Sequence, residues 1–166
     1  MKYILLLLSL LLTLFVSPSL LADPYTLYFI RHAEKDLTKK ADPELTSQGQ
    51  ETAKKLAQYL SDKPLQAVLS SDYRRTKQTA EPVLNRHDLA LTIYNPRELA
   101  ELANQLLSKK QTVLVVGHSN TTPEIVSLVG GKSKPISDEE YGELFIVSIN
   151  PEQGTTVTTY HQLTER

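Results

Sequence analysis

Short apolar, β-prone runs alternate along this chain with segments of helical periodicity, and this alternation constrains the fold most strongly. The runs are continuously apolar, as in strands that are buried on both faces. They are Thr26–Ile30, Ala67–Leu69 and Thr112–Val116. A hairpin is predicted near the C-terminus, over Leu144–Ile149 and Thr155–Tyr160. Strands that alternate with helices predict an α/β fold, here a three-layer sandwich with a mostly parallel central sheet.

Two segments between these runs carry the i, i+3, i+4, i+7 spacing of an amphipathic helix. The first extends from Ala53 to Leu60, with Thr46 upstream as a natural N-cap. The second extends from Leu99 to Leu106, with Asn95 as the predicted N-cap and Pro96 as the predicted first helical residue. Both helices are expected to cover the sheet with their apolar faces.

Composition excludes several classes of function. The 166 residues include 18 Lys+Arg and 19 Asp+Glu, a formal net charge of −1, which argues against a strongly basic nucleic-acid binder. The chain contains no cysteine, so a disulfide framework, a thiolate zinc site, an iron–sulfur cluster and a cysteine nucleophile are excluded. We therefore expect no nucleic-acid partner, no metal and no other cofactor.

The N-terminal segment differs in composition from the rest of the chain. Its apolar stretch from Tyr3 to Val16 is shorter than the roughly 20 residues that a membrane-spanning helix needs. Ala22 is the expected cleavage point of a signal peptidase. We therefore expect residues 1–22 to be a signal peptide and residues 23–166 to be one domain, periplasmic or secreted, with no stable membrane anchor after cleavage. The alternative is an uncleaved N-terminal anchor, because Leu20 is unfavourable three residues before the cut.

Two of the four histidines follow predicted strands. His32 comes directly after Arg31 at the end of one run, and His118 follows the end of another. Ligands of such sheets bind beyond the carboxyl ends of the strands. An imidazole can attack phosphorus, while a guanidinium and a second imidazole can hold phosphate oxygens, so these residues indicate phosphoryl chemistry. His87 and His161 lie in polar surroundings and are predicted to be ordinary surface residues.

Four ordered segments resemble the histidine phosphatase superfamily, which contains the cofactor-dependent phosphoglycerate mutases and small phosphohistidine phosphatases. Arg31–Lys35, with the sequence Arg-His-Ala-Glu-Lys, resembles the Arg-His-Gly/Ala-Glu signature of the family. The family's helix entry, second arginine segment and second histidine segment resemble Leu45–Gly49, Ser70–Ala80 and Val115–Asn120. The resemblance extends from Leu27 to about Gly131, and it implies a phosphoglycerate mutase-like fold.

The resemblance also implies roles for individual residues. It makes His32 the nucleophile that becomes phosphohistidine, and it places Arg31, Arg75 and His118 around the phosphate. Two arginines give a phosphate dianion strong charge-assisted hydrogen bonds. The attacking nitrogen of His32 should be unprotonated, with a backbone carbonyl accepting the proton of the other nitrogen. Arg74 competes with Arg75, which we prefer because it precedes the Thr-x-Gln-Thr-Ala continuation.

The general acid that would protonate the leaving oxygen is not fixed by the sequence. In the mutases it is a glutamate in an insert after the second arginine, and this chain is short between that point and His118. Three carboxylates are candidates, and each has a structural alternative. Glu98 and Glu124 also fit helix-capping patterns, and Asp72 also fits a turn before a helix.

The sequence predicts a metal-independent phosphatase that acts on a small phosphorylated substrate or a phosphoprotein. A mutase is less favoured, because the short connection before His118 offers little lid to hold water away from a phosphorylated intermediate. Two alternatives stay open. The unassigned acid would suit a non-catalytic phosphate-binding module. Ser119 would be the nucleophile if the segment Gly117–Thr121 were the elbow of a serine hydrolase, although Thr121 stands where that motif has glycine.

Overall fold

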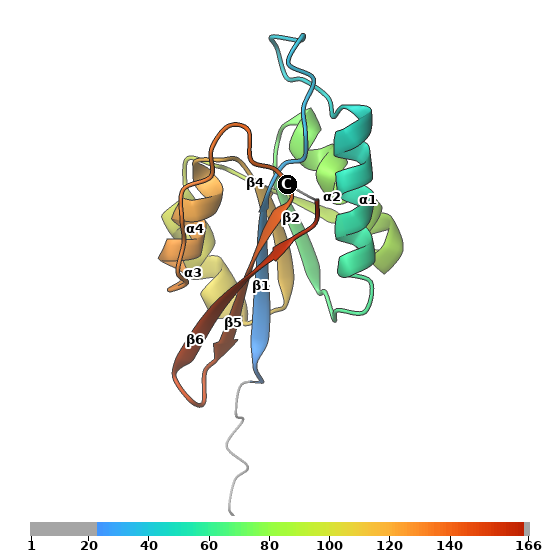
Figure 1. Ribbon diagram of the computed structural model, residues 1–166. Coiled ribbons are helices and arrows are strands. Elements are labelled where there is room, and N and C mark those ends of the chain that lie inside the picture. The colour runs from blue at the N-terminus through green and yellow to red at the C-terminus, as the bar shows by residue number, and fades with distance from the viewer. Residues whose placement is uncertain (1–22, 165–166) are drawn as a thin grey trace, which may run out of the picture.

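The computed structural model describes residues 23–164 and contains a six-stranded sheet with helices on both faces (Figure 1). The predicted signal peptide lies outside the described residues. In chain order the elements are β1 (Tyr25–Arg31), α1 (Ser47–Tyr59), β2 (Ala67–Ser71), α2 (Arg74–His87), β3 (Leu91–Tyr94), α3 (Leu99–Lys109), β4 (Val113–Gly117), α4 (Thr121–Leu128), β5 (Glu143–Asn150) and β6 (Thr155–Gln162).

The strand order in the sheet is β3-β2-β4-β1-β5-β6. β3, β2, β4 and β1 are parallel to one another, whereas β5 is antiparallel to both β1 and β6. The sheet is therefore mixed, and the prediction of a mostly parallel sheet needs this correction. The predicted C-terminal hairpin does form, but it joins the main sheet, because β5 pairs along β1 with Phe145 opposite Phe29.

Helices cover the sheet in two pairs, which makes the three layers that the sequence predicts. Figure 1 shows α1 and α2 on one face and α3 and α4 on the other. Each pair buries its apolar side against alternate residues of the strands. The core under α1 and α2 includes Leu56, Val83, Val68 and Leu114, and the core under α3 and α4 includes Leu102, Val126, Val115 and Phe145.

The start of α1 is held against the segment that follows β1. Thr46 is the N-cap, as predicted, and its hydroxyl accepts a hydrogen bond from the backbone N–H of Gly49 at 3.1 Å. A Cβ on Gly49 would lie 2.2 Å from the carbonyl oxygen of Glu34, so glycine allows the helix to approach this closely. The same carbonyl accepts a hydrogen bond from the N–H of Thr46 at 2.9 Å. These contacts fix the backbone two residues beyond His32.

The start of α3 differs from the prediction. The helix begins at Leu99, and Asn95 and Pro96 precede it. The side chain of Asn95 accepts a hydrogen bond from the N–H of Arg97 at 3.1 Å, which makes a turn within the loop. Glu98 occupies the N-cap position without a side-chain capping bond. The predicted capping box is therefore wrong, because the side chain of Asn95 is used before the helix begins.

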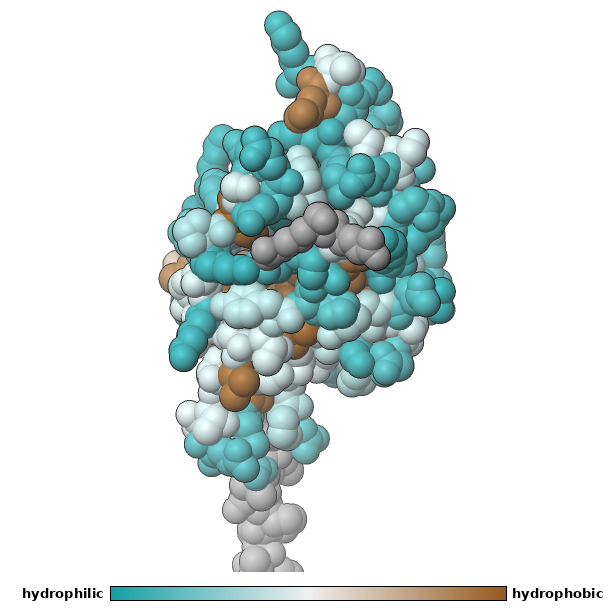
Figure 2. Space-filling view, viewed as in Figure 1, coloured by the Kyte–Doolittle hydropathy of each residue, from teal (hydrophilic) through white to brown (hydrophobic). Residues whose placement is uncertain are grey.

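One face of the described part of the chain is largely hydrophilic. Figure 2 shows hydrophilic residues over most of the visible face, with the hydrophobic ones scattered singly or in small groups. Within residues 23–164, no helix is long and apolar enough to span a membrane.

Candidate active site

The two histidines that follow predicted strands lie side by side at the carboxyl ends of β1 and β4. These strands are neighbours, with Arg31 in register with Gly117. The backbone N–H of His32 donates to the carbonyl of Gly117 at 2.9 Å, which continues the pairing by one residue. The rings of His32 and His118 have centroids 5.6 Å apart and meet edge to face. Sheet pairing therefore sets the separation of the two imidazoles.

Arg75 reaches these histidines from the first turn of α2. Its Nη2 lies 3.4 Å from Nδ1 of His118, and its side chain is 15% exposed. The neighbouring Arg74 is 55% exposed and forms an ion pair with Glu44 outside the pocket. The later part of the arginine segment ties α2 to the first motif, because the hydroxyl of Thr79 accepts a hydrogen bond from the N–H of Ala33 at 3.0 Å. The structure thus brings Arg75, rather than Arg74, to the histidines.

Arg31 is buried beneath the loop that leads into β5. Its Nη1 donates to the carbonyls of Ser137 at 2.8 Å and Glu140 at 2.9 Å. Its guanidinium lies 4.2 Å from the ring centroid of Tyr141, close enough for a cation–π contact. Its Nη2 makes longer contacts, 3.4 Å to the hydroxyl of Tyr141 and 3.9 Å to the carboxylate of Asp138. Among residues 23–164, Nη2 of Arg31 therefore has only long contacts, and its buried Nε has no hydrogen-bond partner.

The histidines and arginines line one cavity of about 360 Å³. Several of its residues have no role in the sequence prediction. Lys35 is the last residue of the first motif, so its position and charge could have indicated a place in the site. Asp138 and Arg97 come from loops without a recognisable pattern. The lining residues are Arg31, His32, Lys35, Tyr73, Arg75, Pro96, Arg97, His118, Ser119, Asn120, Thr121 and Asp138.

The hydrogen bonds of His32 fix its tautomer. Its Nδ1 lies 2.8 Å from the carbonyl oxygen of Ala33, and a carbonyl can accept but not donate. Nδ1 therefore carries the hydrogen, and Nε2 keeps its lone pair. Burial lowers the pKa of His32 to about 3, and the charges of Arg31 and Arg75 act in the same direction. His32 is thus a neutral imidazole with an unprotonated Nε2, as the sequence predicts.

His118 is neutral for similar reasons. Burial lowers its pKa to about 4, and the neighbouring charges of Arg75 and Lys35 add to the effect. Its Nδ1 faces the guanidinium of Arg75, which can only donate, so Nδ1 accepts. Its Nε2 then carries the hydrogen and donates to the hydroxyl oxygen of Ser71 at 2.9 Å. The partner of His118 at the far side of the ring is therefore a buried serine at the end of β2.

The lowered histidine pKa values make folding stability depend on pH. In the unfolded chain both rings protonate near pH 6.5, whereas the folded rings stay neutral down to about 3 for His32 and about 4 for His118. Between pH 6.5 and 4 the unfolded chain binds more protons, so stability falls as pH falls. We expect the thermal unfolding midpoint to drop from pH 7 to pH 4.5, and to drop less in His32→Gln. Circular dichroism melts of wild type and His32→Gln across this pH range measure the effect. An identical slope in His32→Gln would contradict the expectation.

The three candidate acids do not line this cavity. Glu98 is exposed and borders a separate hollow beside α3. Glu124 is exposed in the first turn of α4. Asp72 forms an ion pair with Lys77 at 2.7 Å, which fits its structural alternative. The geometry therefore brings none of the three to the histidines.

The remaining candidates are also placed by the structure. Ser119 lines the cavity, and its hydroxyl donates to Asp138 at 3.4 Å rather than to a histidine ring. His87 contacts the carbonyl of Leu60 at 3.0 Å, and the ring of His161 stacks on Tyr59, so neither lies in the cavity. Within residues 23–164, no group of three or more His, Cys, Asp or Glu side chains could hold a metal ion.

The sequence matches a known family over residues 27–112, just over half of the chain. The matching family is the histidine phosphatase superfamily, branch 1. This chain belongs to that superfamily. The match covers His32 and Arg75 and ends before His118, so the place of His118 in the site rests on the structure.

Comparison with individual proteins agrees with membership of the histidine phosphatase superfamily. The human enzyme 6-phosphofructo-2-kinase/fructose-2,6-bisphosphatase 4 is 42% identical over 64 residues, which are 35% of this chain and 14% of the human protein. The corresponding rat protein is 41% identical over the same length. The matched part is thus about one seventh of these curated relatives, and it shows what the chain resembles locally.

Solved structures of two phosphatases share the fold over nearly their whole length. The protein histidine phosphatase SixA, solved with tungstate, has a TM-score of 0.68 at 19% identity, with 83% of this chain and 97% of SixA covered. A mycobacterial glucosyl-3-phosphoglycerate phosphatase has a TM-score of 0.62 at 13% identity, with 84% of this chain and 98% of the mycobacterial protein covered. These likenesses establish an α/β fold of the phosphoglycerate mutase-like kind.

Proposed function

We propose that this histidine phosphatase superfamily member is a metal-independent phosphatase that works through a phosphohistidine on His32. The observation that carries the proposal is that His32, a neutral imidazole with an unprotonated Nε2, lines the same cavity as the guanidinium groups of Arg31 and Arg75. The buried Nε atoms of Arg31 and Arg75 have no hydrogen-bond partner among the described residues. Buried donors of this kind are costly unless an acceptor satisfies them, and phosphate oxygens are strong acceptors.

The reaction proceeds in two transfers. Nε2 of His32 attacks phosphorus while the bond to the leaving oxygen breaks, and that oxygen takes up a proton. Water then attacks the phosphohistidine, the P–N bond breaks, and inorganic phosphate leaves. Arg31, Arg75 and His118 stabilise the charge on the equatorial phosphate oxygens in both steps. The hydrogen bond from Nδ1 of His32 to Ala33 holds the ring in its attacking orientation.

The substrate is a phosphomonoester or a phosphohistidine, carried by a small molecule or by a protein. The related structures include phosphatases for both kinds of substrate, a protein histidine phosphatase and a sugar phosphoglycerate phosphatase. The cavity opens between the loops after β1, β3 and β4, and Lys35 and Arg97 at its edge add positive charge. Both features suit an anionic substrate.

The proposal is tested by assaying the purified full chain against a panel of phosphomonoesters and a phosphohistidine peptide, with a chelator and no added metal. Release of inorganic phosphate that is unchanged by the chelator is the expected result. Binding of phosphate without turnover would favour a phosphate-binding module. Ester hydrolysis that is lost in Ser119→Ala would favour the serine hydrolase.

We also propose that the protein is exported, on the composition of residues 1–22. The expected result is a mature chain that begins at or near Asp23 in the periplasmic or secreted fraction. N-terminal mass spectrometry of each fraction measures this. Recovery of a chain that begins at Met1 in the cytosol alone would contradict export.

A further inference from the structure

The cavity that holds the two histidines has one carboxylate among its described lining residues, Asp138. Transfer of phosphate from an alkyl ester requires a proton on the leaving oxygen, because an alkoxide is a poor leaving group. The three carboxylates suggested by the sequence lie elsewhere, and the histidines are neutral with their hydrogens engaged by Ala33 and Ser71. Asp138, on the loop before β5, is therefore the carboxylate of the cavity lining that could supply this proton.

The position of Asp138 depends on Arg31. The two carbonyls that accept from Nη1 of Arg31 belong to Ser137 and Glu140, which flank Asp138 in the chain. The carboxylate of Glu140 accepts from the N–H of Ser137 at 2.8 Å and closes the turn. Tyr141 packs against the guanidinium at the end of the same turn. A buried arginine of the phosphate pocket thus fixes the backbone on both sides of Asp138.

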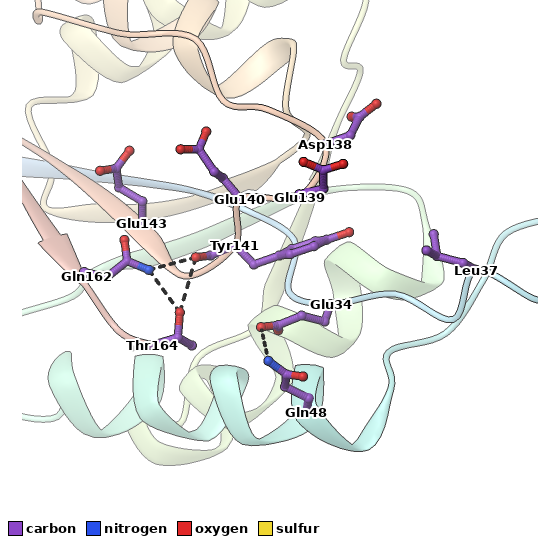
Figure 3. Close-up of a pocket in the computed structure, with 10 residues that line it drawn as sticks. All are labelled: Glu34, Leu37, Gln48, Asp138, Glu139, Glu140, Tyr141, Glu143, Gln162 and Thr164. Carbon is purple, nitrogen blue, oxygen red and sulfur yellow. Dashed lines mark hydrogen bonds between the residues drawn. The ribbon is translucent and has the colours of Figure 1, made fainter. Parts of the chain in front are cut away.

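The side chain of Asp138 extends from this turn across the edge of the cavity. Its Oδ1 lies 3.9 Å from Nη2 of Arg31 and accepts from the hydroxyl of Ser119 at 3.4 Å. The side chain is 94% exposed, so it can rotate without disturbing the core. In Figure 3 the ring of Tyr141 lies between Glu34 and the turn that carries Asp138. Glu34 therefore belongs to the adjoining acidic cavity, while Asp138 borders both spaces.

We propose that Asp138 is the general acid that protonates the leaving oxygen. This role rests on the proposed phosphatase function. As the bond from Nε2 of His32 to phosphorus forms and the P–O bond breaks, the carboxyl proton passes to the leaving oxygen. The resulting carboxylate then takes a proton from the water that attacks phosphorus, the P–N bond breaks, and the carboxyl group and the neutral His32 are restored.

The test compares Asp138→Asn with the wild-type full chain on an alkyl phosphate and on 4-nitrophenyl phosphate, whose leaving anion is stable. Removing a general acid typically costs about 10²–10⁴-fold. We expect a loss of this size in kcat on the alkyl phosphate and a loss of less than about tenfold on the aryl phosphate. Asp138→Glu should recover part of the alkyl rate. Glu139→Gln, on the same turn, and Glu98→Gln should behave as wild type on both substrates.

Other outcomes overturn the role. An equal loss on both substrates would mean that Asp138 organises the pocket without donating a proton, and wild-type rates on both would mean that it does neither. A large alkyl-specific loss in Glu98→Gln would assign the acid to that residue. If wild type releases phosphate from no phosphomonoester of the panel and not from the phosphohistidine peptide, the proposed function fails, and the role of Asp138 fails with it. If wild type releases phosphate from the phosphohistidine peptide but from no ester, the proposed function stands and this inference alone is wrong. If wild type hydrolyses both and Asp138→Asn is unselective, the proposed function stands and this inference alone is wrong.

Discussion

Replacing His32 with alanine is expected to abolish turnover. Loss of a covalent nucleophile costs roughly 10⁶-fold in kcat in a well-studied hydrolase. His32 is the proposed nucleophile, and it lines the same cavity as Arg31 and Arg75. The same change should remove the labelled phosphate that wild type retains when the reaction is quenched in alkali. Steady-state phosphate release and retained label measure the two effects.

The matched controls for His32 are the histidines outside the cavity. His87→Ala and His161→Ala should keep both turnover and retained label near wild type, because their rings contact Leu60 and Tyr59 rather than the pocket. Label retained in His32→Ala would contradict the covalent role. Label that maps to Ser119 would transfer the role to that hydroxyl.

Replacing Arg75 with alanine is expected to lower kcat by roughly 10³–10⁵-fold, the range seen when an arginine that stabilises a transferring phosphoryl group is removed. Arg75 approaches the histidines, with its Nη2 3.4 Å from His118, and the side chain is largely buried. Steady-state rates on one aryl phosphate, with circular dichroism to confirm folding, measure the effect. The amount of labelled phosphate retained on the protein should fall together with kcat, because the proposed transfer from substrate to His32 is slowed.

Arg74→Ala is the matched control, since it removes the same charge one residue away. Arg74 is exposed and pairs with Glu44 outside the cavity, and exposed ion pairs contribute little to stability. The kcat of Arg74→Ala should therefore stay within a few-fold of the wild-type value. Equal losses in Arg74→Ala and Arg75→Ala would show that general positive charge, rather than a placed guanidinium, assists the reaction.

Local sequence patterns predicted the helices and strands with the strongest periodicity. They did not predict features that depend on pairing between segments far apart in the sequence. The buried runs of β1, β2 and β4 and the capped start of α1 lie close to their predicted places. β3 does not show in the sequence, because Thr92 and Ile93 of this edge strand are exposed and leave no apolar run. The mixed character of the sheet depends on pairing across more than 100 residues, as between Phe29 and Phe145, for which no local signal exists.

The sequence predicted those site residues that lie at the ends of apolar strands or within recognisable motifs. His32 and His118 follow β1 and β4, and Arg75 opens α2 in a recognisable segment. Asp138 lies in a polar loop that has no distinctive sequence pattern. Only the structure shows that Arg31 binds two backbone carbonyls of this loop. The acid candidates taken from the sequence were chosen by nearness along the chain, which says little about nearness in space.

The strands that carry the histidines are the two innermost of the sheet, and this has a consequence for how the protein loses activity. β4 and β1 have a neighbouring strand on either side and helices over both faces. Backbone amides in such positions exchange with solvent through global opening, whereas loops open locally. His32 and His118 should therefore stay in place until the whole domain melts. The loop around Asp138 lies outside the sheet, so we expect gentle heating to remove the proposed proton donation before it removes the proposed phosphate transfer.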